Sequence, residues 1–154
     1  MVITRCSKAD FDQILHDIVD FWGSDRTLRL HHPTVLYEFG NTAYVIKEEG
    51  RVVAYLFGFI SQTSSVGYVH LSAVRRSHRR RGLGRRLYEH FIAFVREEGC
   101  TELKAITTPT NCESIAFHQG IGMELLGKPN EEGIPVVQDY SGPGLHRVVF
   151  SKRL

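Results

Sequence analysis

The sequence lacks a long hydrophobic run, and this absence excludes a membrane-spanning helix, which needs about 18 consecutive apolar residues. Net charge is only +2 and 42% of the 154 residues are hydrophobic, a balance that excludes disordered, collagen-like and coiled-coil chains. No repeat and no Pro-, Gly- or Ser-rich linker divides the chain. A chain of this length typically forms one domain with its own core, so we expect a single domain over residues 1–154.

Cysteine is also scarce, because Cys6, Cys100 and Cys112 are the whole set and form no CxxC pair. Such a set excludes the disulfide scaffold of a secreted protein and a structural zinc site. Neighbouring His31 and His32 lack the i,i+4 spacing of a helical metal pair, and we expect no metal. The first 15 residues hold no uncharged hydrophobic run, so we expect no signal peptide and a cytoplasmic protein with reduced thiols.

Positive charge, by contrast, is concentrated in one segment. Residues 71–90 hold seven arginines and one acid, which leaves 12 basic and 16 acidic residues in the rest of the chain. A concentrated basic segment favours a concentrated anion such as a polyphosphate or a nucleic acid. The plain alternative is a solvated surface, but the glycines that interrupt this run argue against it.

Hydrophobic periodicity and turn residues predict the order β-α-α-β-β-β-α-β-α-β-β, a mixed α/β sheet without a regular βα repeat. A Ser7 cap and a Thr110/Glu113 capping box mark two helix starts. The expected helices cover 7–22, 33–39, a segment from Leu83 to Gly99, and 111–120; the main expected strands cover 42–48, 51–61, 67–74 and 102–108. Two further strands at MELLG and HRVVFSKR flank a long loop, 127–145.

The sequence RRRGLGRRL lies between an expected strand and an expected helix. A helix N-terminus presents unpaired N–H groups to an anion, and Gly82 and Gly84 let the backbone approach a phosphate closely. A dinucleotide fingerprint needs a third glycine where Leu87 stands, and a P-loop needs Gly-Lys-Ser/Thr, which is absent. Both of those nucleotide motifs are therefore excluded.

What remains is Arg79-x-x-Gly82-x-Gly84, and at this point the chain resembles the GNAT superfamily of N-acetyltransferases. The preceding strand ends in Ala73-Val74, as is common in that family. Asn111-x-x-Ser114-x-x-Phe117-His118 is similar to the family's second cofactor motif. With the matching element order, the resemblance covers nearly the whole chain, and it is specific for the superfamily and its cofactor rather than for a substrate.

The resemblance implies a mixed, mostly antiparallel central sheet of about seven strands flanked by about four helices, with the strands 67–74 and 102–108 splayed beside acetyl-CoA. Backbone groups of Ala73 and Val74 would bind the pantetheine arm. The implied diphosphate site is Arg79, Arg80, Arg81, Gly82, Leu83, Gly84 and Arg85. Asn111 would bind near the thiol end, and Ser114, Phe117 and His118 complete the implied cofactor set.

Acetyl transfer to an amine needs a proton acceptor, since an amine with a pKa near 10.4 is mostly charged at pH 7. Strand alternation places Tyr68, His70 and Ser72 on one polar face of the 67–74 strand. The family often carries a glutamate base on this strand, and this chain has none. We expect His70 to serve as the base, or else to be a core histidine bonded to backbone; Tyr68 is a candidate to position a water.

His118 stands where many family members carry a tyrosine acid. An imidazole can protonate the leaving thiolate, but an apolar contact or a hydrogen bond to pantetheine explains the residue equally well. If His118 is not the acid, solvent is. Cys112 follows a helix cap without an evident base beside it, which argues against an acetyl-enzyme.

Trp22, Asp139 and Tyr140 are the candidate acceptor-binding residues, because acids and aromatics in loops can hold a cationic amine. Glu131 and Glu132 lie in the same long loop, and the alternative is that these groups simply solvate loops.

The sequence therefore predicts direct acetyl transfer from acetyl-CoA to a primary amine, by a homodimer that binds neither nucleic acid nor membrane. Two alternatives stay open. One is a non-catalytic acyl-CoA-binding regulatory module. The other is a nucleic-acid binder that uses the arginine cluster 75–86, although no aromatic residue interleaves with those arginines.

Overall fold

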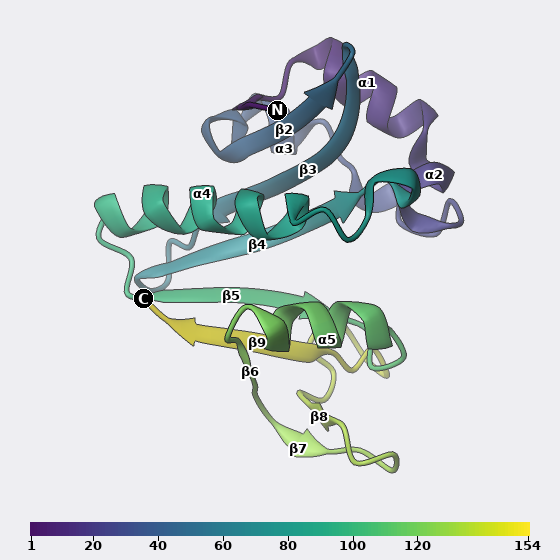
Figure 1. The fold of residues 1–154 in the computed structure, drawn as a ribbon. Helices are drawn as coiled ribbons and strands as arrows, with labels where there is room; N and C mark the ends of the chain where they lie inside the picture. The colour runs from purple at the N-terminus through teal and green to yellow at the C-terminus, as the bar shows by residue number, and fades with distance from the viewer. The chain divides into compact units, whose positions relative to one another are not determined.

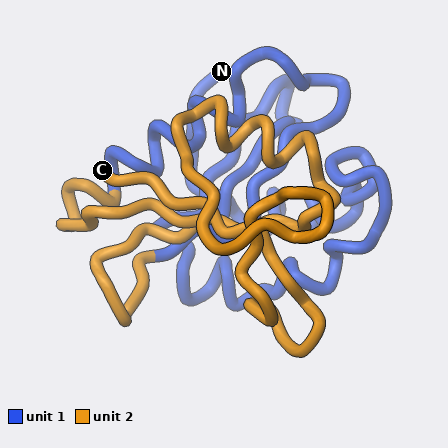
Figure 2. Tube along the Cα trace, turned by 90° about the horizontal axis from the view of Figure 1, so that it is seen from below, with its two compact units in different colours: residues 1–59, 69–94 blue, residues 60–68, 95–154 orange.

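The computed structural model describes residues 1–154 as two compact units (Figure 2). Unit 1 comprises Met1–Phe59 and Val69–Phe94, and unit 2 comprises Ile60–Tyr68 and Val95–Leu154. Strand β4 (Val66–Val74) and helix α4 (Leu83–Glu97) contribute residues to both. No helix is both long enough and apolar enough to cross a membrane.

Unit 1 orders its strands β1-β2-β3-β4, with antiparallel pairing of β1 with β2 and of β2 with β3 (Figure 1). Its strands and α-helices besides β4 and α4 are β1 (Ile3–Arg5), α1 (Lys8–His16), α2 (Ile18–Trp22), α3 (Thr34–Tyr37), β2 (Ala43–Glu48) and β3 (Arg51–Ile60). Three 3-10 turns join them: η1 (Leu28–Leu30), η2 (Gly40–Thr42) and η3 (Arg76–His78).

Local sequence explains these elements well. Ser7 caps α1 as predicted, because its hydroxyl accepts from the Asp10 N–H at 3.1 Å while the Asp10 carboxylate accepts from the Ser7 N–H at 3.0 Å. The predicted helix 7–22 is broken at Asp17 into α1 and α2. Glu49 and Gly50 turn β2 into β3 with positive φ at both residues, the geometry of a tight hairpin.

The core of unit 1 packs the apolar faces of α1 and α2 against β2 and β3. Phe11, Ile14, Phe21, Tyr55 and Phe57 are all essentially inaccessible to solvent. Each such side chain stabilises the fold by roughly 1.5–3 kcal/mol relative to exposure.

Unit 2 orders its strands β5-β9-β6, and the β5–β9 and β9–β6 pairs are antiparallel. Helix α5 runs alongside β9 in Figure 1. The elements of unit 2 besides β4 and α4 are β5 (Glu102–Thr107), α5 (Cys112–Gly120), β6 (Glu124–Leu125), β7 (Lys128–Pro129), β8 (Pro135–Val136) and β9 (Val148–Arg153).

The predicted α/β fold is confirmed, with about seven strands in the main sheet as expected and a separate pair, β7 and β8. Two local predictions were wrong. The side-chain cap of α5 is Asn111 rather than Thr110, because the Asn111 side chain accepts from the Ser114 N–H at 3.1 Å. The loop 127–145 is not wholly irregular, since β7 and β8 form a small hairpin within it.

Candidate functional site

Arg75, the first arginine of the basic segment, is a buried structural residue with only 3% of its surface exposed. Its guanidinium binds Asp17 and Asp20, each at 2.9 Å, and also donates to the Val52 carbonyl. Burial alone raises the pKa of Asp17, but hydrogen bonds from His16 and Arg75 outweigh it and the pKa lies below its usual value. Arg75 thus anchors the end of β4 to the α1–α2 junction.

Three further arginines of the segment are also used within unit 1. Arg79 donates to the Phe21 carbonyl at 3.1 Å, and Arg86 donates to the Met1 carbonyl at 2.6 Å. The Arg76 guanidinium lies directly over Gly23, where a Cβ would come within 2.1 Å of it. Of the seven arginines only Arg75 is buried, and Arg80, Arg81 and Arg85 are exposed beside the start of α4. The segment is therefore a smaller positive surface than the sequence indicates.

The start of α4 has the geometry of an anion site. Gly82 has φ +75°, and a Cβ placed on it meets no atom within 4 Å, so its outer side is open. The first i→i−4 hydrogen bond runs from the Arg86 N–H to the Gly82 carbonyl. The amides of Leu83 and Gly84 therefore receive no carbonyl from the helix, and Gly82 has no side chain to cap them. These amides and the exposed arginines fit a diphosphate.

The turn that leads into this loop is held by hydrogen bonds of the His78 ring. His78 Nε2 lies 2.5 Å from the Glu48 carboxylate, and the Ser77 hydroxyl contacts the other ring nitrogen at 2.8 Å. The hydrogen bond from His78 lowers the pKa of Glu48. This contact ties η3 to the β2–β3 hairpin immediately before Arg79.

Along β4, burial follows the predicted alternation. Val69 and Leu71 are buried, whereas Tyr68, His70 and Ser72 are half-buried. Burial raises the pKa of the Tyr68 phenol to about 12, and nearby Tyr140 adds to the shift, so Tyr68 is a neutral hydroxyl at pH 7. The structure thus brings together Tyr68 and Tyr140, two of the predicted site residues.

His70 makes one contact with unit 1, between Nε2 and the Leu30 carbonyl at 3.4 Å. A carbonyl only accepts, so this contact needs the proton on Nε2 and leaves Nδ1 as the basic nitrogen. Burial lowers the pKa of His70 and the Leu30 contact partly opposes it. The ring is therefore neutral at pH 7, as a proton acceptor must be.

His118 has a more enclosed environment. It is buried at 7% exposure and stacks on Phe150 of β9, with the ring centroids 4.1 Å apart. Its Nδ1 donates to the Ser114 carbonyl at 2.7 Å. Burial lowers the pKa of His118 to about 4, so the imidazole carries no second proton at neutral pH. Ser114 thus hydrogen-bonds two residues of the motif, because its N–H donates to the Asn111 side chain and its carbonyl accepts from His118. Half-buried Phe117 contacts the His118 ring edge-on, with the ring centroids 5.2 Å apart.

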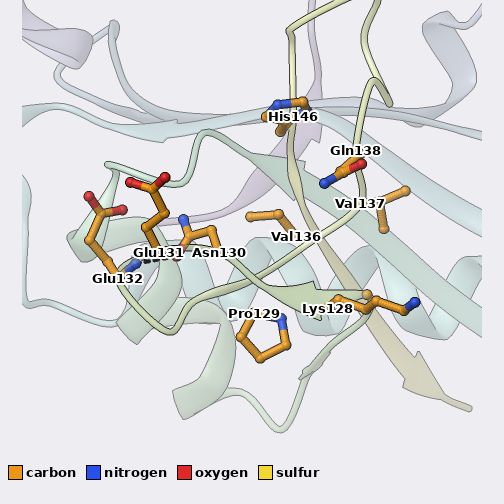
Figure 3. Close-up of a pocket in the computed structure, with 10 residues that line it drawn as sticks. Lys128, Pro129, Asn130, Glu131, Glu132, Val136, Val137, Gln138 and His146 are labelled. Atoms are coloured by element: carbon orange, nitrogen blue, oxygen red, sulfur yellow. Dashed lines mark hydrogen bonds between the residues drawn. The ribbon is translucent and has the colours of Figure 1, made fainter.

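The predicted acceptor-binding residues are placed unequally. Half-buried Trp22 donates from Nε1 to the Tyr55 hydroxyl at 2.7 Å, and Tyr140 is 44% exposed. Asp139 organises its own turn, since its carboxylate accepts from the Gly144 N–H at 2.8 Å. Glu131 and Glu132 line a cavity of about 770 Å³ beside the β7–β8 hairpin, together with His146 (Figure 3).

Two features of the site were missed by the sequence analysis. The arginine run did not reveal that Arg75 is buried against two aspartates more than 50 residues away. The polar contacts of His31 and Tyr55 were also missed, although a tyrosine in the middle of an apolar strand such as VVAYLFGF is the available signal. The three cysteines are unpaired thiols, and no group of three His, Cys, Asp or Glu side chains converges.

Known structures share this fold along nearly the whole chain. Ard1 from Thermoplasma volcanium is 18% identical, with a TM-score of 0.77 over 99% of this chain and 97% of that one. Ribosomal-protein-alanine N-acetyltransferase from Brucella melitensis is 23% identical, with a TM-score of 0.69 over 100% of both chains. An aminoglycoside 6'-N-acetyltransferase complexed with coenzyme A is 14% identical, with a TM-score of 0.70 over 99% and 97%.

No curated protein sequence matches the chain. The profile of the acetyltransferase (GNAT) family matches residues 11–123, which is most of the chain and includes the segments of His70, Gly82 and His118. The resemblance that Arg79, Gly82 and Gly84 suggested is thereby confirmed: this chain belongs to the acetyltransferase (GNAT) family.

Proposed function

We propose that this protein transfers the acetyl group of acetyl-CoA directly to a primary amine. The observation that carries the proposal lies in unit 1, which combines an open, uncapped start of α4 with a neutral, half-buried imidazole on β4. The first feature suits the diphosphate of the donor, and the second suits removal of a proton from the acceptor. Solved proteins of this fold are named as acetyltransferases of alanine and aminoglycoside amines, which supports an amine acceptor.

The cofactor assignment follows the charges and the backbone. The amides of Leu83 and Gly84, with the exposed guanidinium groups of Arg80, Arg81 and Arg85, hold the diphosphate. Backbone groups of Ala73 and Val74 bind the pantetheine arm. In unit 2, the Asn111 side-chain oxygen is used by the α5 cap, so its amino group is the part that binds near the thiol end.

His70 accepts the proton of the attacking amine at Nδ1. The amine nitrogen forms a bond to the thioester carbonyl carbon, the carbon–sulfur bond breaks, and the electron pair leaves with sulfur. The products are the amide and coenzyme A once the thiolate takes up a proton. Because an amine with a pKa of about 10.4 is about 99.96% charged at pH 7, a positioned base relieves part of a handicap of about 4–5 kcal/mol. Tyr68, a neutral hydroxyl, positions a water on the same face of β4.

Of the two roles for His118, the geometry favours binding over acid catalysis. A neutral ring whose only proton is donated to the Ser114 carbonyl has no proton for a thiolate. The stacked, buried ring instead packs beside the cofactor site. Solvent then protonates the leaving thiolate.

The candidate acceptor contacts in unit 2 are acidic and aromatic side chains of the long loop, and the candidate in unit 1 is Trp22 at the α2 exit. Tyr140, near Tyr68, and Trp22 supply aromatic surface, while Asp139 shapes the 139–144 turn. The carboxylates of Glu131 and Glu132 at the cavity attract a cationic acceptor over a distance of about one Debye length. We infer a cytoplasmic homodimer, which size-exclusion chromatography with light scattering tests directly.

The two alternatives predict different behaviour. A nucleic-acid binder needs the arginines free, and Arg75, Arg76, Arg79 and Arg86 are engaged within unit 1. A non-catalytic acyl-CoA-binding module needs no proton acceptor. In such a module the oriented, neutral ring of His70 would have no role.

Calorimetric titration with acetyl-CoA, and with acetyl-pantetheine as the control without the nucleotide, tests the proposal. We expect micromolar binding of acetyl-CoA that is lost in the control, followed by coenzyme A release when primary amines are added. Failure to bind acetyl-CoA contradicts the donor assignment. Tight binding without turnover across peptide and aminoglycoside amines instead favours the regulatory module.

A further inference from the structure

His31 is a buried histidine outside the proposed catalytic groups, and every polar atom of its ring has a partner in unit 1. Nδ1 lies 2.8 Å from the Thr27 carbonyl, and Nε2 lies 2.7 Å from the Tyr55 hydroxyl. The side chain is 4% exposed.

The direction of each hydrogen bond follows from chemistry. The Thr27 carbonyl can only accept, so the single proton of the neutral ring is on Nδ1, and Nε2 accepts the Tyr55 hydroxyl proton while the Tyr55 oxygen accepts from Trp22 Nε1 at 2.7 Å. Nδ1 then carries the ring proton and donates it to the Thr27 carbonyl. The ring is neutral in this arrangement, and burial, the largest cause, lowers the pKa of His31 accordingly.

The hydrogen bonds from Thr27 through His31 to Tyr55 connect a surface turn, η1, to the core. Turn η1 exposes Leu28 and Leu30, with 40% and 46% of their surfaces accessible, so apolar burial of those side chains does not hold it. The buried Thr27 hydroxyl has no hydrogen-bond partner, which costs about 1–3 kcal/mol rather than stabilising the turn. Backbone hydrogen bonds close the turn, and the bridge from Thr27 through His31 to Tyr55 ties it to β3.

The residue before His31 supplies the carbonyl that contacts His70. We propose that His31 is a positioning residue for His70: by fastening η1 to Tyr55, it holds the Leu30 carbonyl against Nε2 and so directs the basic Nδ1 of His70 toward the amine. The inference rests on the proposed function, in which His70 is the base. The inference identifies His31 as the residue that orients the His70 ring, as a general base requires.

The charges around His70 are compatible with this role. His31 is the titratable group that faces His70 from the η1 side, and it is neutral. Tyr68, on the same face of β4, is neutral as well because its pKa is raised to about 12. The Leu30 carbonyl favours the protonated form of His70, so losing that contact lowers the pKa of His70 further.

Tyr55→Phe is the principal test, because it deletes one oxygen and keeps a ring that packs edge-on against Phe21 and tilted against Phe57. We expect kcat to fall about tenfold, KM for acetyl-CoA to stay within twofold, and the acidic limb of the kcat profile to move to lower pH. In ¹⁵N NMR spectra of the histidine rings, we expect His70 as the Nε2–H tautomer in the wild type and as a tautomer mixture in the variant.

A second pair of variants guards against loss of folding. His31→Leu breaks the bridge, whereas His31→Gln keeps one donor and one acceptor and is expected to restore the tautomer in part. Thr27→Val is the matched control in the same turn. It removes the unpartnered hydroxyl and keeps the carbonyl. We therefore expect an unfolding free energy equal to or above that of the wild type, with an unchanged kcat and an unmoved acidic limb of the pH profile.

The outcomes separate this inference from the proposed function. An unchanged His70 tautomer and an unmoved acidic limb in Tyr55→Phe and His31→Leu overturn the positioning role, even if kcat falls with stability. A wild-type Nε2–H tautomer that is lost in both variants supports it, whether or not the protein turns over. Absence of turnover with every amine overturns the proposed function alone.

Discussion

Two helices of this chain begin at the segments that we propose to bind the cofactor, and they begin in opposite ways. Helix α4 in unit 1 starts at Gly82, which provides no side chain to bind the first amides. Helix α5 in unit 2 starts at Asn111, whose side chain caps the Ser114 N–H. The N-cap residue of the first helix supplies no side-chain cap, whereas the N-cap residue of the second does.

His70 and His118 also differ in how many of their polar groups are used within the protein. His70 has one long contact to a carbonyl and a half-buried ring, whereas His118 is stacked on Phe150 and bonded to Ser114 at 2.7 Å. Burial lowers both pKa values. The same residue type is thus a candidate base where one nitrogen stays accessible, and a packing and binding group where the ring is enclosed.

The largest effect that can test this contrast is on the rate. His70→Ala is expected to lower kcat about 100-fold, because a positioned base contributes roughly 10²–10⁴-fold. The wild-type rate should fall as pH drops through a His70 pKa below 6.5, since a protonated ring cannot accept the amine proton. Steady-state kinetics from pH 5 to 9 measure both, and His118→Phe is the comparison, with a much smaller loss of kcat. An acidic limb that survives unchanged in His70→Ala eliminates the base assignment.

The alternation that placed His70 was predictable because it is local: a strand exposes every second residue, and β4 follows that period. Which arginines are buried and which are exposed was not predictable. Arg75 is buried because it pairs with Asp17 and Asp20, which lie more than 50 residues earlier at the α1–α2 junction. Charge patterning in sequence counts guanidinium groups but does not locate their partners. The cap of α5 was misplaced by one residue because Thr110 and Asn111 are both good capping residues.

The second effect is on stability, and it concerns His118. Its pKa is about 4 in the folded protein and about 6.5 in the unfolded chain, so the unfolded state binds an extra proton between these values. Stability contributed by the neutral ring is therefore present above pH 6.5 and lost as pH falls to 4, by on the order of 3 kcal/mol. Urea unfolding at pH 7, 5.5 and 4.5 should show a smaller loss in His118→Phe than in the wild type. An equal loss in the two proteins contradicts the enclosed ring.

The third effect separates ligand binding from backbone strain at Gly82. Gly82 and Gly50 have φ of +75° and +76°, and a Cβ meets no atom within 4 Å at either. Alanine at each position should cost a similar 1–2 kcal/mol of unfolding free energy, about the penalty of left-handed backbone. Only Gly82→Ala should also raise the Kd for acetyl-CoA, by about tenfold, because its methyl group occupies the open side of the loop. If Gly50→Ala raises the Kd equally, or Gly82→Ala leaves it unchanged, Gly82 serves the turn and not the diphosphate.

The smallest effect divides the two halves of the Asn111 amide. Asn111→Ala should lose about 1 kcal/mol of unfolding free energy, because the Ser114 N–H loses its cap. Asn111→Asp keeps an oxygen for the cap and adds negative charge at the start of α5, which the helix dipole favours, so its stability should match the wild type. The aspartate has no amino group, however, and the Kd for acetyl-CoA should rise a few-fold in both variants. Thermal unfolding and calorimetry measure the two quantities separately. A Kd that rises only in the alanine variant would mean that Asn111 acts on the ligand through the helix start it caps, and the contrast between the ligand-directed α4 and the self-satisfied α5 would then be complete.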